Sequence, residues 1–207
     1  MITLAIDTST PHGSVALLDG ETLLMNEAFT ADRRASSSLF VTLEKVRAGI
    51  EHLDQIAVGL GPGSYAGVRI SIAAALGLRL AFGAKLVGLP SVAALETESS
   101  AYIAIGDARR ESFYFSRVED HVCVEGPLLA TEAELAQHLE RWAALPLLAT
   151  APVPQFPAAQ IALPSAAILA RLAAETRGIV ATENLEPIYL REPYITQPKS
   201  RPGILPR

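Results

Sequence analysis

The spacing of apolar side chains along the chain switches between the two-residue period of β-strands and the three-to-four-residue period of helices. The N-terminal part follows the shorter period, and strands are expected over 3–7 and 13–19. The Asp19-Gly20 pair is a strong hairpin signal before a third strand that includes Leu23 and Met25. The chain is therefore expected to start as a β-meander.

Two helices and two short strands are expected after this meander. Leu39, Leu43 and Val46 recur at helical spacing, and Gly49 ends that run. A second, longer apolar run is rich in alanine and glycine, which is typical of a helix that lies close to another helix. The expected bounds are 36–48 and 66–82 for the helices and 56–60 and 85–89 for the strands.

The second half repeats the order of the first, with strands ahead of a helix. Its first strand ends in Asp107, as the first strand of the chain ends in Asp7, and Thr131 with Glu134 forms a capping box. The expected strands are 102–107, 112–118, 122–129 and 145–149, and the last helix is 165–177. We therefore predict a duplicated α/β architecture of two lobes, residues 1–98 and 99–207, the second with a Pro-rich tail.

The composition is that of a folded protein with a substantial core. Half of the 207 residues are hydrophobic, the mean hydropathy is +0.29 and the net charge is only −5. These values exclude an intrinsically disordered chain. The single cysteine, Cys123, cannot form a disulfide within the chain, so the sequence fits a reducing compartment.

The distribution of charge argues against a chain that grips nucleic acid by itself. Residues 1–100 carry 7 Lys/Arg against 10 Asp/Glu, and residues 101–207 carry 10 against 12. Neither half therefore offers a basic face to a phosphate backbone. Only the segment from Tyr189 onward leans positive, and it is expected to be a solvated tail. Its basic residues are Arg191, Lys199, Arg201 and Arg207.

The sequence predicts neither an export signal nor a membrane span. The N-terminus has no basic region, and Asp7 interrupts the first apolar run too early for a signal peptide. The stretch between Arg141 and Arg171 has no charged residue, but five prolines break it. A spanning helix could not keep its backbone hydrogen-bonded through them. We predict a soluble, cytoplasmic protein.

The most informative motif is the glycine-rich segment 59–69, between a predicted strand and a predicted helix. Such a segment allows a tight turn, and the helix N-terminus behind it favours an anion. It lacks the Gly-Lys-Ser/Thr of a Walker A loop, the sixth-position glycine of the dinucleotide fingerprint and the flanking glycines of a nucleophile elbow. Its spacing alone favours a structural turn that brings the helix close to the sheet.

A second candidate is the hydroxyl-rich segment that starts at Asp7. Actin-like phosphotransferases place a metal-associated aspartate and phosphate-binding donors at such a strand end, although these residues also favour an ordinary Asx turn. The opposing half of a nucleotide clamp is missing, because Asp107 is followed by Ala108 and two arginines instead of glycine and hydroxyls. We interpret the following residues as a vestigial nucleotide cleft: Asp7, Thr8, Ser9, Gly61, Gly63 and Ser64.

Other chemistry has little support. The four histidines form no pair at metal-ligand spacing, so no metal site is expected. Cys123 lies between two valines in a strand pattern, which favours a buried apolar role over a catalytic thiol. The run from Asp107 to Glu111 carries four charges and is expected to be a turn, either solvated or ion-paired at an interface.

Taken together, these segments resemble the TsaB (YeaZ-like) family, whose members are subunits of the system that makes threonylcarbamoyladenosine in tRNA. The most specific match is Gly61-Pro62-Gly63-Ser64-Tyr65-Ala66-Gly67-Val68-Arg69. The supporting matches are Ile6-Asp7-Thr8-Ser9, Gly13-Ser14-Val15-Ala16, Gly88-Leu89-Pro90-Ser91, Asp107-Ala108-Arg109-Arg110 and Glu186-Pro187-Ile188-Tyr189-Leu190-Arg191. They run in order over nearly the whole chain.

The resemblance implies an α/β actin-like (ASKHA, ribonuclease H-like) fold of two lobes, each with a mixed β-sheet flanked by helices. It implies a non-catalytic scaffold that pairs with the transferase TsaD and the ATPase TsaE, and reaches tRNA only through that complex. No cofactor of its own is expected, ATP belongs to the complex, and the chain alone is expected to form a homodimer. The implied interface on helices 36–48 and 66–82 includes Leu39, Leu43, Val46, Arg69, Ile70, Ala74 and Leu78.

Two departures and two alternatives accompany this hypothesis. The family often has His-Ser-Glu where this chain has Ala35-Ser36-Ser37, and the stretch 146–164 is short and Pro-rich. A small actin-like ATPase or sugar kinase that acts alone through Asp7 is the main alternative. A metallopeptidase relative of TsaD, which would need zinc or iron, is another. The missing second phosphate loop and the acidic composition favour the scaffold.

Overall fold

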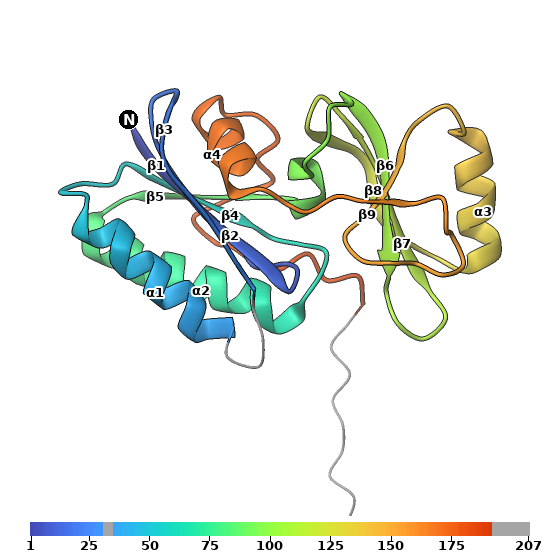
Figure 1. The fold of residues 1–207 in the computed structure, drawn as a ribbon, viewed down its shortest axis with the longest axis horizontal. Coiled ribbons are helices and arrows are strands. Elements are labelled where there is room, and N and C mark those ends of the chain that lie inside the picture. The colour runs from blue at the N-terminus through green and yellow to red at the C-terminus, as the bar shows by residue number, and fades with distance from the viewer. Residues whose placement is uncertain (31–34, 192–207) are drawn as a thin grey trace, which may run out of the picture.

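A computed structural model of the chain describes residues 1–30 and 35–191, which form two β-sheets side by side with helices around them (Figure 1). The first sheet has six strands in the order β11-β5-β4-β1-β2-β3. Its central strand β1 pairs antiparallel with β2 and parallel with β4, so the sheet is mixed. The strands are β1 (Ile2–Asp7), β2 (His12–Asp19), β3 (Thr22–Thr30), β4 (Gln55–Gly59), β5 (Lys85–Leu89) and β11 (Ala181–Thr182).

Helices cover both faces of the first sheet. α1 (Ala35–Ala48) and α2 (Tyr65–Phe82) lie along one face, and α4 (Ala166–Ala174) lies on the other (Figure 1). Strand alternation sends Leu4 and Ile6 toward α1 and α2, whereas Ala5 faces α4. Because both faces are covered, all six residues of β1 are buried, including the polar Thr3 and Asp7.

The second sheet has five strands in the order β10-β9-β6-β7-β8 and is also mixed. α3 (Glu132–Arg141) packs on one face, and the short helix η1 (Ser91–Ala94) packs on the other with Tyr102. The Thr131–Glu134 capping box is confirmed at the start of α3. The strands are β6 (Ala101–Asp107), β7 (Phe113–Glu119), β8 (Val122–Ala130), β9 (Leu147–Ala149) and β10 (Gln160–Ile161).

The chain returns to the first sheet after building the second. α4 packs against Ala5, Ala16 and Ala57, whose small side chains let the alanine-rich helix lie close, and β11 pairs with β5. The expectation that residues 99–207 form the second lobe is therefore wrong for α4 and β11, which belong to the first lobe. The basic residues Lys199, Arg201 and Arg207 of the expected tail lie outside the described residues.

Candidate functional site

The glycine-rich turn and the end of the first strand form one closely packed unit. A Cβ on Gly63 would lie 2.1 Å from the Ser9 carbonyl oxygen, and a Cβ on Gly67 would lie 2.0 Å from the Thr8 carbonyl oxygen. The backbone N–H of Ser64 donates a 2.6 Å hydrogen bond to the Ser9 carbonyl. Only glycine allows backbone to approach backbone this closely. The motif therefore brings helix α2 against the sheet, as its spacing alone indicated.

Asp7 lies behind this unit, at the end of β1, and is only 1% exposed. Its Oδ1 accepts hydrogen bonds from the Ser9 backbone N–H at 2.8 Å and the Ser9 hydroxyl at 2.7 Å. Its Oδ2 lies so close to Gly59 that a Cβ there would be 1.8 Å away. Burial raises the pKa of Asp7, although the hydroxyls of Ser91 and Ser9 oppose that effect. The carboxyl group is therefore enclosed by its own chain.

A cavity of about 660 Å³ opens between the two lobes. Five segments line it, and they come from both sheets and from the C-terminal part of the described chain. Of the six residues predicted for a vestigial cleft, Ser9, Gly63 and Ser64 are at the cavity wall, whereas Asp7, Thr8 and Gly61 are not. The Thr8 hydroxyl is instead committed to the Gly67 carbonyl at 2.7 Å. The structure thus brings the six residues together but leaves only half of them at the cavity.

The mouth of this cavity carries an aromatic pair to which the sequence analysis assigned no role. The rings of Tyr65 and Tyr189 lie with their centroids 5.5 Å apart and tilted by 37°. The Arg69 guanidinium carbon lies 5.1 Å from the Tyr65 centroid, and Nη1 donates a 2.6 Å hydrogen bond to the Tyr65 hydroxyl. Both tyrosines lie in segments that match the TsaB family, residues 61–69 and 186–191. That match was the sequence signal that could have pointed to them.

The β6–β7 turn brings Arg109 to the same mouth. Arg109, Arg110 and Glu111 follow one another with φ of 64°, 53° and 56°. Left-handed backbone at non-glycine residues costs about 1–3 kcal/mol each, and such strain is concentrated at functional sites. Asp107 stabilises the turn, because its carboxylate accepts from the Arg109 backbone N–H at 2.6 Å and pairs with the guanidinium at 3.2 Å. The predicted turn is confirmed: its ion pair is a local one between Asp107 and Arg109, and both side chains are solvated.

The C-terminal segment connects the two lobes across the cavity. The backbone N–H of Ile188 donates to the Leu60 carbonyl at 2.8 Å in the first lobe. Leu190 packs on the apolar cluster of the second lobe, and Nη2 of Arg191 contacts the Arg109 carbonyl at 3.5 Å. The wall also contains Tyr114, whose pKa is raised to about 12 by burial, so it presents a neutral phenol at physiological pH.

The outer face of α1 and α2 is a second candidate site, and the structure corrects its membership. Leu39, Leu43, Val46 and Ala74 are buried in the core, so they cannot meet a partner. Ile70 and Leu78 are half-buried, and Arg69 is exposed. The side chains that do face outward are Phe40, Val41, Ala73, Leu76 and Leu80, together with Gly77. We call this set the α1–α2 face; the side chains of Ala35 and Ser36 lie outside the described residues.

α2 is unusual in its apolar surface. Of the described helices, only α2 is long and apolar enough to cross a membrane, a criterion that core helices of soluble proteins also meet. Its inner side packs on the first sheet through Val68, Ile72 and Ala75. Its outer side leaves Leu80 88% exposed. These exposed apolar side chains make the outer side of α2 a candidate interaction surface.

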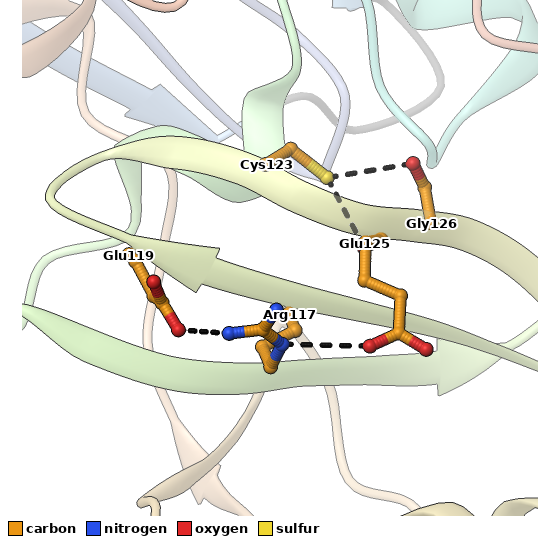
Figure 2. Close-up of polar contacts among 5 residues, drawn as sticks. All are labelled: Arg117, Glu119, Cys123, Glu125 and Gly126. Carbon is orange, nitrogen blue, oxygen red and sulfur yellow. Dashed lines mark hydrogen bonds and ion pairs between the residues drawn. The ribbon is translucent and has the colours of Figure 1, made fainter.

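The most densely ion-paired site of the second lobe is structural (Figure 2). Arg117 on β7 pairs with Glu119 and with Glu125 at 3.4 Å, and its guanidinium lies 4.3 Å from the centroid of the Trp142 ring. Cys123 Sγ lies 3.5 Å from the Glu125 carbonyl oxygen (Figure 2). Burial raises the pKa of Cys123, so the thiol is protonated at neutral pH and is a poor nucleophile. Among the described residues, no His, Cys, Asp and Glu side chains gather as a metal site.

Comparison with known proteins identifies related sequences along most of the chain. A family model described as TsaD, tRNA N6-adenosine threonylcarbamoyltransferase, matches residues 33–176. An uncharacterized protein of Mycobacterium tuberculosis is 30% identical over 204 residues, which cover 92% of each chain. The tRNA threonylcarbamoyladenosine biosynthesis protein TsaB of Haemophilus influenzae is 38% identical over 128 residues, which cover 56% of this chain and 52% of that protein.

The fold has solved counterparts. The structure of YeaZ from Pseudomonas aeruginosa superimposes with a TM-score of 0.70 at 24% identity and covers 91% of this chain and 100% of that one. A second Pseudomonas aeruginosa structure, titled as similar to peptidase YEAZ, gives the same TM-score and identity. The predicted α/β fold, with two mixed sheets flanked by helices, is thereby confirmed.

Proposed function

This chain belongs to the TsaB (YeaZ-like) family, within the larger family described as TsaD, tRNA N6-adenosine threonylcarbamoyltransferase, and from this premise we propose how it acts. It takes part in the biosynthesis of threonylcarbamoyladenosine in tRNA. Its role is that of a non-catalytic subunit, which pairs with a TsaD-type transferase and works with a TsaE-type ATPase. The α1–α2 face is the pairing surface, and the cytoplasm is the compartment.

The main support for this proposal is an exposed glycine, Gly77, on the α1–α2 face. Gly77 lies in the last third of α2 and is exposed, and a Cβ built on it would meet no described atom within 4 Å. No described residue requires glycine there, and a glycine inside a helix costs about 0.5–1 kcal/mol relative to alanine. Flanked by the exposed Leu76 and Leu80, it gives a partner helix room to approach the α2 backbone closely. A helix-on-helix joint explains all three residues.

The enclosure of Asp7 supports a non-catalytic role over the main alternative. A solitary actin-like ATPase or sugar kinase needs its strand-end aspartate open to a metal and a nucleotide. Here the Asp7 carboxyl group is 1% exposed, accepts two hydrogen bonds from Ser9 and abuts Gly59. We therefore place ATP in the assembled complex and not in this chain alone. When no partner is present, we expect two copies to pair through the same α1–α2 face.

Reconstituted tRNA modification tests the proposal. A TsaD-type transferase, a TsaE-type ATPase and the enzyme that supplies the threonylcarbamoyl donor are incubated with a tRNA transcript, with and without this chain. Modified adenosine should form only when the chain is present, and the chain alone should not hydrolyse ATP. Full modification without it, or ATP turnover that Asp7→Ala abolishes, would show that the solitary enzyme is the better account. Metal analysis of the purified chain tests the metallopeptidase alternative.

A matched pair of variants tests the pairing surface. Leu80→Arg places a charge on the α1–α2 face, whereas Ile161→Arg places the same charge on β10 of the second sheet, where Ile161 is 54% exposed. Modification and co-elution with the transferase should be lost only with Leu80→Arg, because burying an unpaired charge in a joint is strongly unfavourable. If Leu80→Arg and Ile161→Arg gave equal modification and equal co-elution, the α1–α2 face would not be the pairing surface.

A further inference from the structure

The mouth of the interlobe cavity is chemically unlike the α1–α2 face. Tyr65 is the first residue of α2 and is 51% exposed, and Tyr189 from the C-terminal segment is 43% exposed. Their rings, 5.5 Å apart, leave aromatic surface in contact with water. Arg69 lies over the Tyr65 ring and is held by its hydroxyl. Exposed tyrosines beside an arginine are typical of binding surfaces rather than of a solvated edge.

Cationic groups surround these rings. The Arg109 side chain is 87% exposed, and the strained β6–β7 turn holds its backbone at the cavity wall. Arg191 lines the same wall, and Arg69 stands at its edge. Asp107, already paired with Arg109, also lines this wall. The mouth therefore concentrates positive charge on a chain whose net charge is −5.

A buried donor at this wall points to an anionic ligand. Nε of Arg191 is buried and, within the described part of the chain, has no hydrogen-bond partner. Such a donor is costly unless an acceptor reaches it. The N-terminus of α2 opens onto the same cavity through Ser64 and Tyr65, and the helix dipole there favours negative charge. Both features favour an anionic group, such as a phosphate, at this wall.

We propose that this mouth is a contact site for unpaired nucleotides of RNA, an inference that rests on the proposed function in tRNA modification. Tyr65 and Tyr189 form the platform on which a base stacks, and Arg69, Arg109 and Arg191 bind the adjoining phosphates. The site contributes contacts to an RNA that the transferase partner also holds, because the chain as a whole has no basic face.

The combination of rings and arginines selects single-stranded RNA. Aromatic side chains bind unstacked bases with little sequence preference, and arginine binds phosphates beside them. Duplex RNA keeps its bases stacked inside the helix, so it offers nothing to Tyr65 and Tyr189. A protein partner could also pack on the two rings. It would then have to supply a carboxylate to Arg191 Nε, where RNA supplies a phosphate.

Two experiments test the site. In the first, the full chain alone is crosslinked by ultraviolet light to a tRNA transcript at low salt, and the crosslinked peptides are identified. In the second, the affinity of the reconstituted complex for the transcript is measured by fluorescence anisotropy at several salt concentrations. The variants are Tyr65→Leu with Tyr189→Leu, the matched pair Tyr65→Phe with Tyr189→Phe, and Arg109→Gln. Arg177→Gln, an exposed arginine outside the cavity wall, is the charge control.

Crosslinks should map to the peptides that contain Tyr65 or Tyr189. The leucine pair should weaken RNA binding by about fivefold or more, and the phenylalanine pair should keep most of it because the rings remain. Arg109→Gln should reduce the slope of log affinity against log salt by about 0.7, the value for one phosphate contact with a single strand, and Arg177→Gln should not. Affinity for the transferase should be unchanged in all of them.

Four results would overturn the site. These are unchanged RNA affinity in the leucine pair, equal binding of a fully duplex RNA, loss of transferase affinity instead of RNA affinity, and displacement of the RNA by free ATP. The third would assign the mouth to a protein, and the fourth to a free nucleotide. A fifth such result is crosslinks that map to peptides without Tyr65 or Tyr189; because the crosslinking needs no partner, this result counts even if the chain does not pair with a transferase.

Discussion

The Thr8 hydroxyl donates a 2.7 Å hydrogen bond to the Gly67 carbonyl oxygen, and a Cβ on Gly67 would lie 2.0 Å from the Thr8 carbonyl oxygen. These two residues thus hold the end of β1 and the first turn of α2 in direct backbone contact. The contact fixes where α2 begins and, with it, the position of the α1–α2 face and of Tyr65 at the cavity mouth. The glycine motif therefore serves both candidate sites through packing.

Gly67→Ala should destabilise the protein because the added methyl group must displace the Thr8 backbone. We expect a loss of about 1–3 kcal/mol in the free energy of unfolding, as is usual for overpacking in a close-packed interior. Urea denaturation followed by circular dichroism measures it. A variant as stable as the parent protein would show that the close contact between Thr8 and Gly67 is not present in solution.

Gly77→Ala is the matched change on the same helix and should act in the opposite direction. The new methyl group meets no atom within 4 Å, so the isolated chain should gain about 0.5–1 kcal/mol of stability from helix propensity. Pairing with the transferase should weaken, because the methyl group stands in the joint. Isothermal titration calorimetry measures that affinity. Unweakened pairing would exclude a close helix contact at residue 77.

Leu80→Arg and Leu39→Arg separate the surface from the core. Leu80 is 88% exposed and Leu39 is 0% exposed, so only the second substitution buries a charge within the chain. Leu80→Arg should leave the melting temperature within a few degrees of the parent value, whereas Leu39→Arg should unfold the protein or lower its stability by several kcal/mol. Differential scanning calorimetry distinguishes them. Similar melting temperatures would contradict the observed orientation of α1.

Asp7→Asn should stabilise the protein at neutral pH. Burial raises the pKa of Asp7, so the native state keeps this proton to higher pH than the unfolded state does. The stability that the protonated group contributes is complete below about pH 4 and is lost as pH rises through the native pKa. Asparagine keeps the acceptor for Ser9 and carries no charge. Urea denaturation should show a gain at pH 7 that shrinks toward pH 4; a gain independent of pH would contradict the raised pKa.

Cys123 should react slowly with a disulfide reagent such as DTNB at pH 8. Its pKa is raised by burial, and the thiolate is the reactive form. The reaction should accelerate as pH increases and should become fast after the protein is unfolded in urea. Native protein that reacts as rapidly as unfolded protein would show that the thiol is accessible and ionised.

The order of the longer elements was predictable because local pattern determines it, whereas the two-residue strands β10 and β11 were not predicted. The turn signal at Asp19-Gly20, the capping box at Thr131 and the buried run of β4 each specify their own segment. The sheet that α4 joins could not be predicted, since its apolar periodicity says only that it is buried. Its partners Ala5, Ala16 and Ala57 lie more than a hundred residues earlier in the chain.

The candidate sites were only partly predictable for the same reason. α1 has apolar residues on two faces, and the more regular stripe, with Leu39 and Leu43, belongs to the core rather than to a partner. Phe40 and Val41 break that period and face outward. The pairing of Tyr65 with Tyr189 depends on where the C-terminal segment crosses the lobes, which no local pattern encodes.

The way α4 and β11 return to the first sheet bears on how the chain matures on the ribosome. Until residues 166–182 leave the exit tunnel, the nascent first sheet has strands β1 to β5 but lacks the helix that shields its alanine-lined side. Stable folding of the first sheet must therefore wait until residues 166–182 have been made, since domains generally fold as units. During that interval the side that α4 will cover exposes its apolar surface to water.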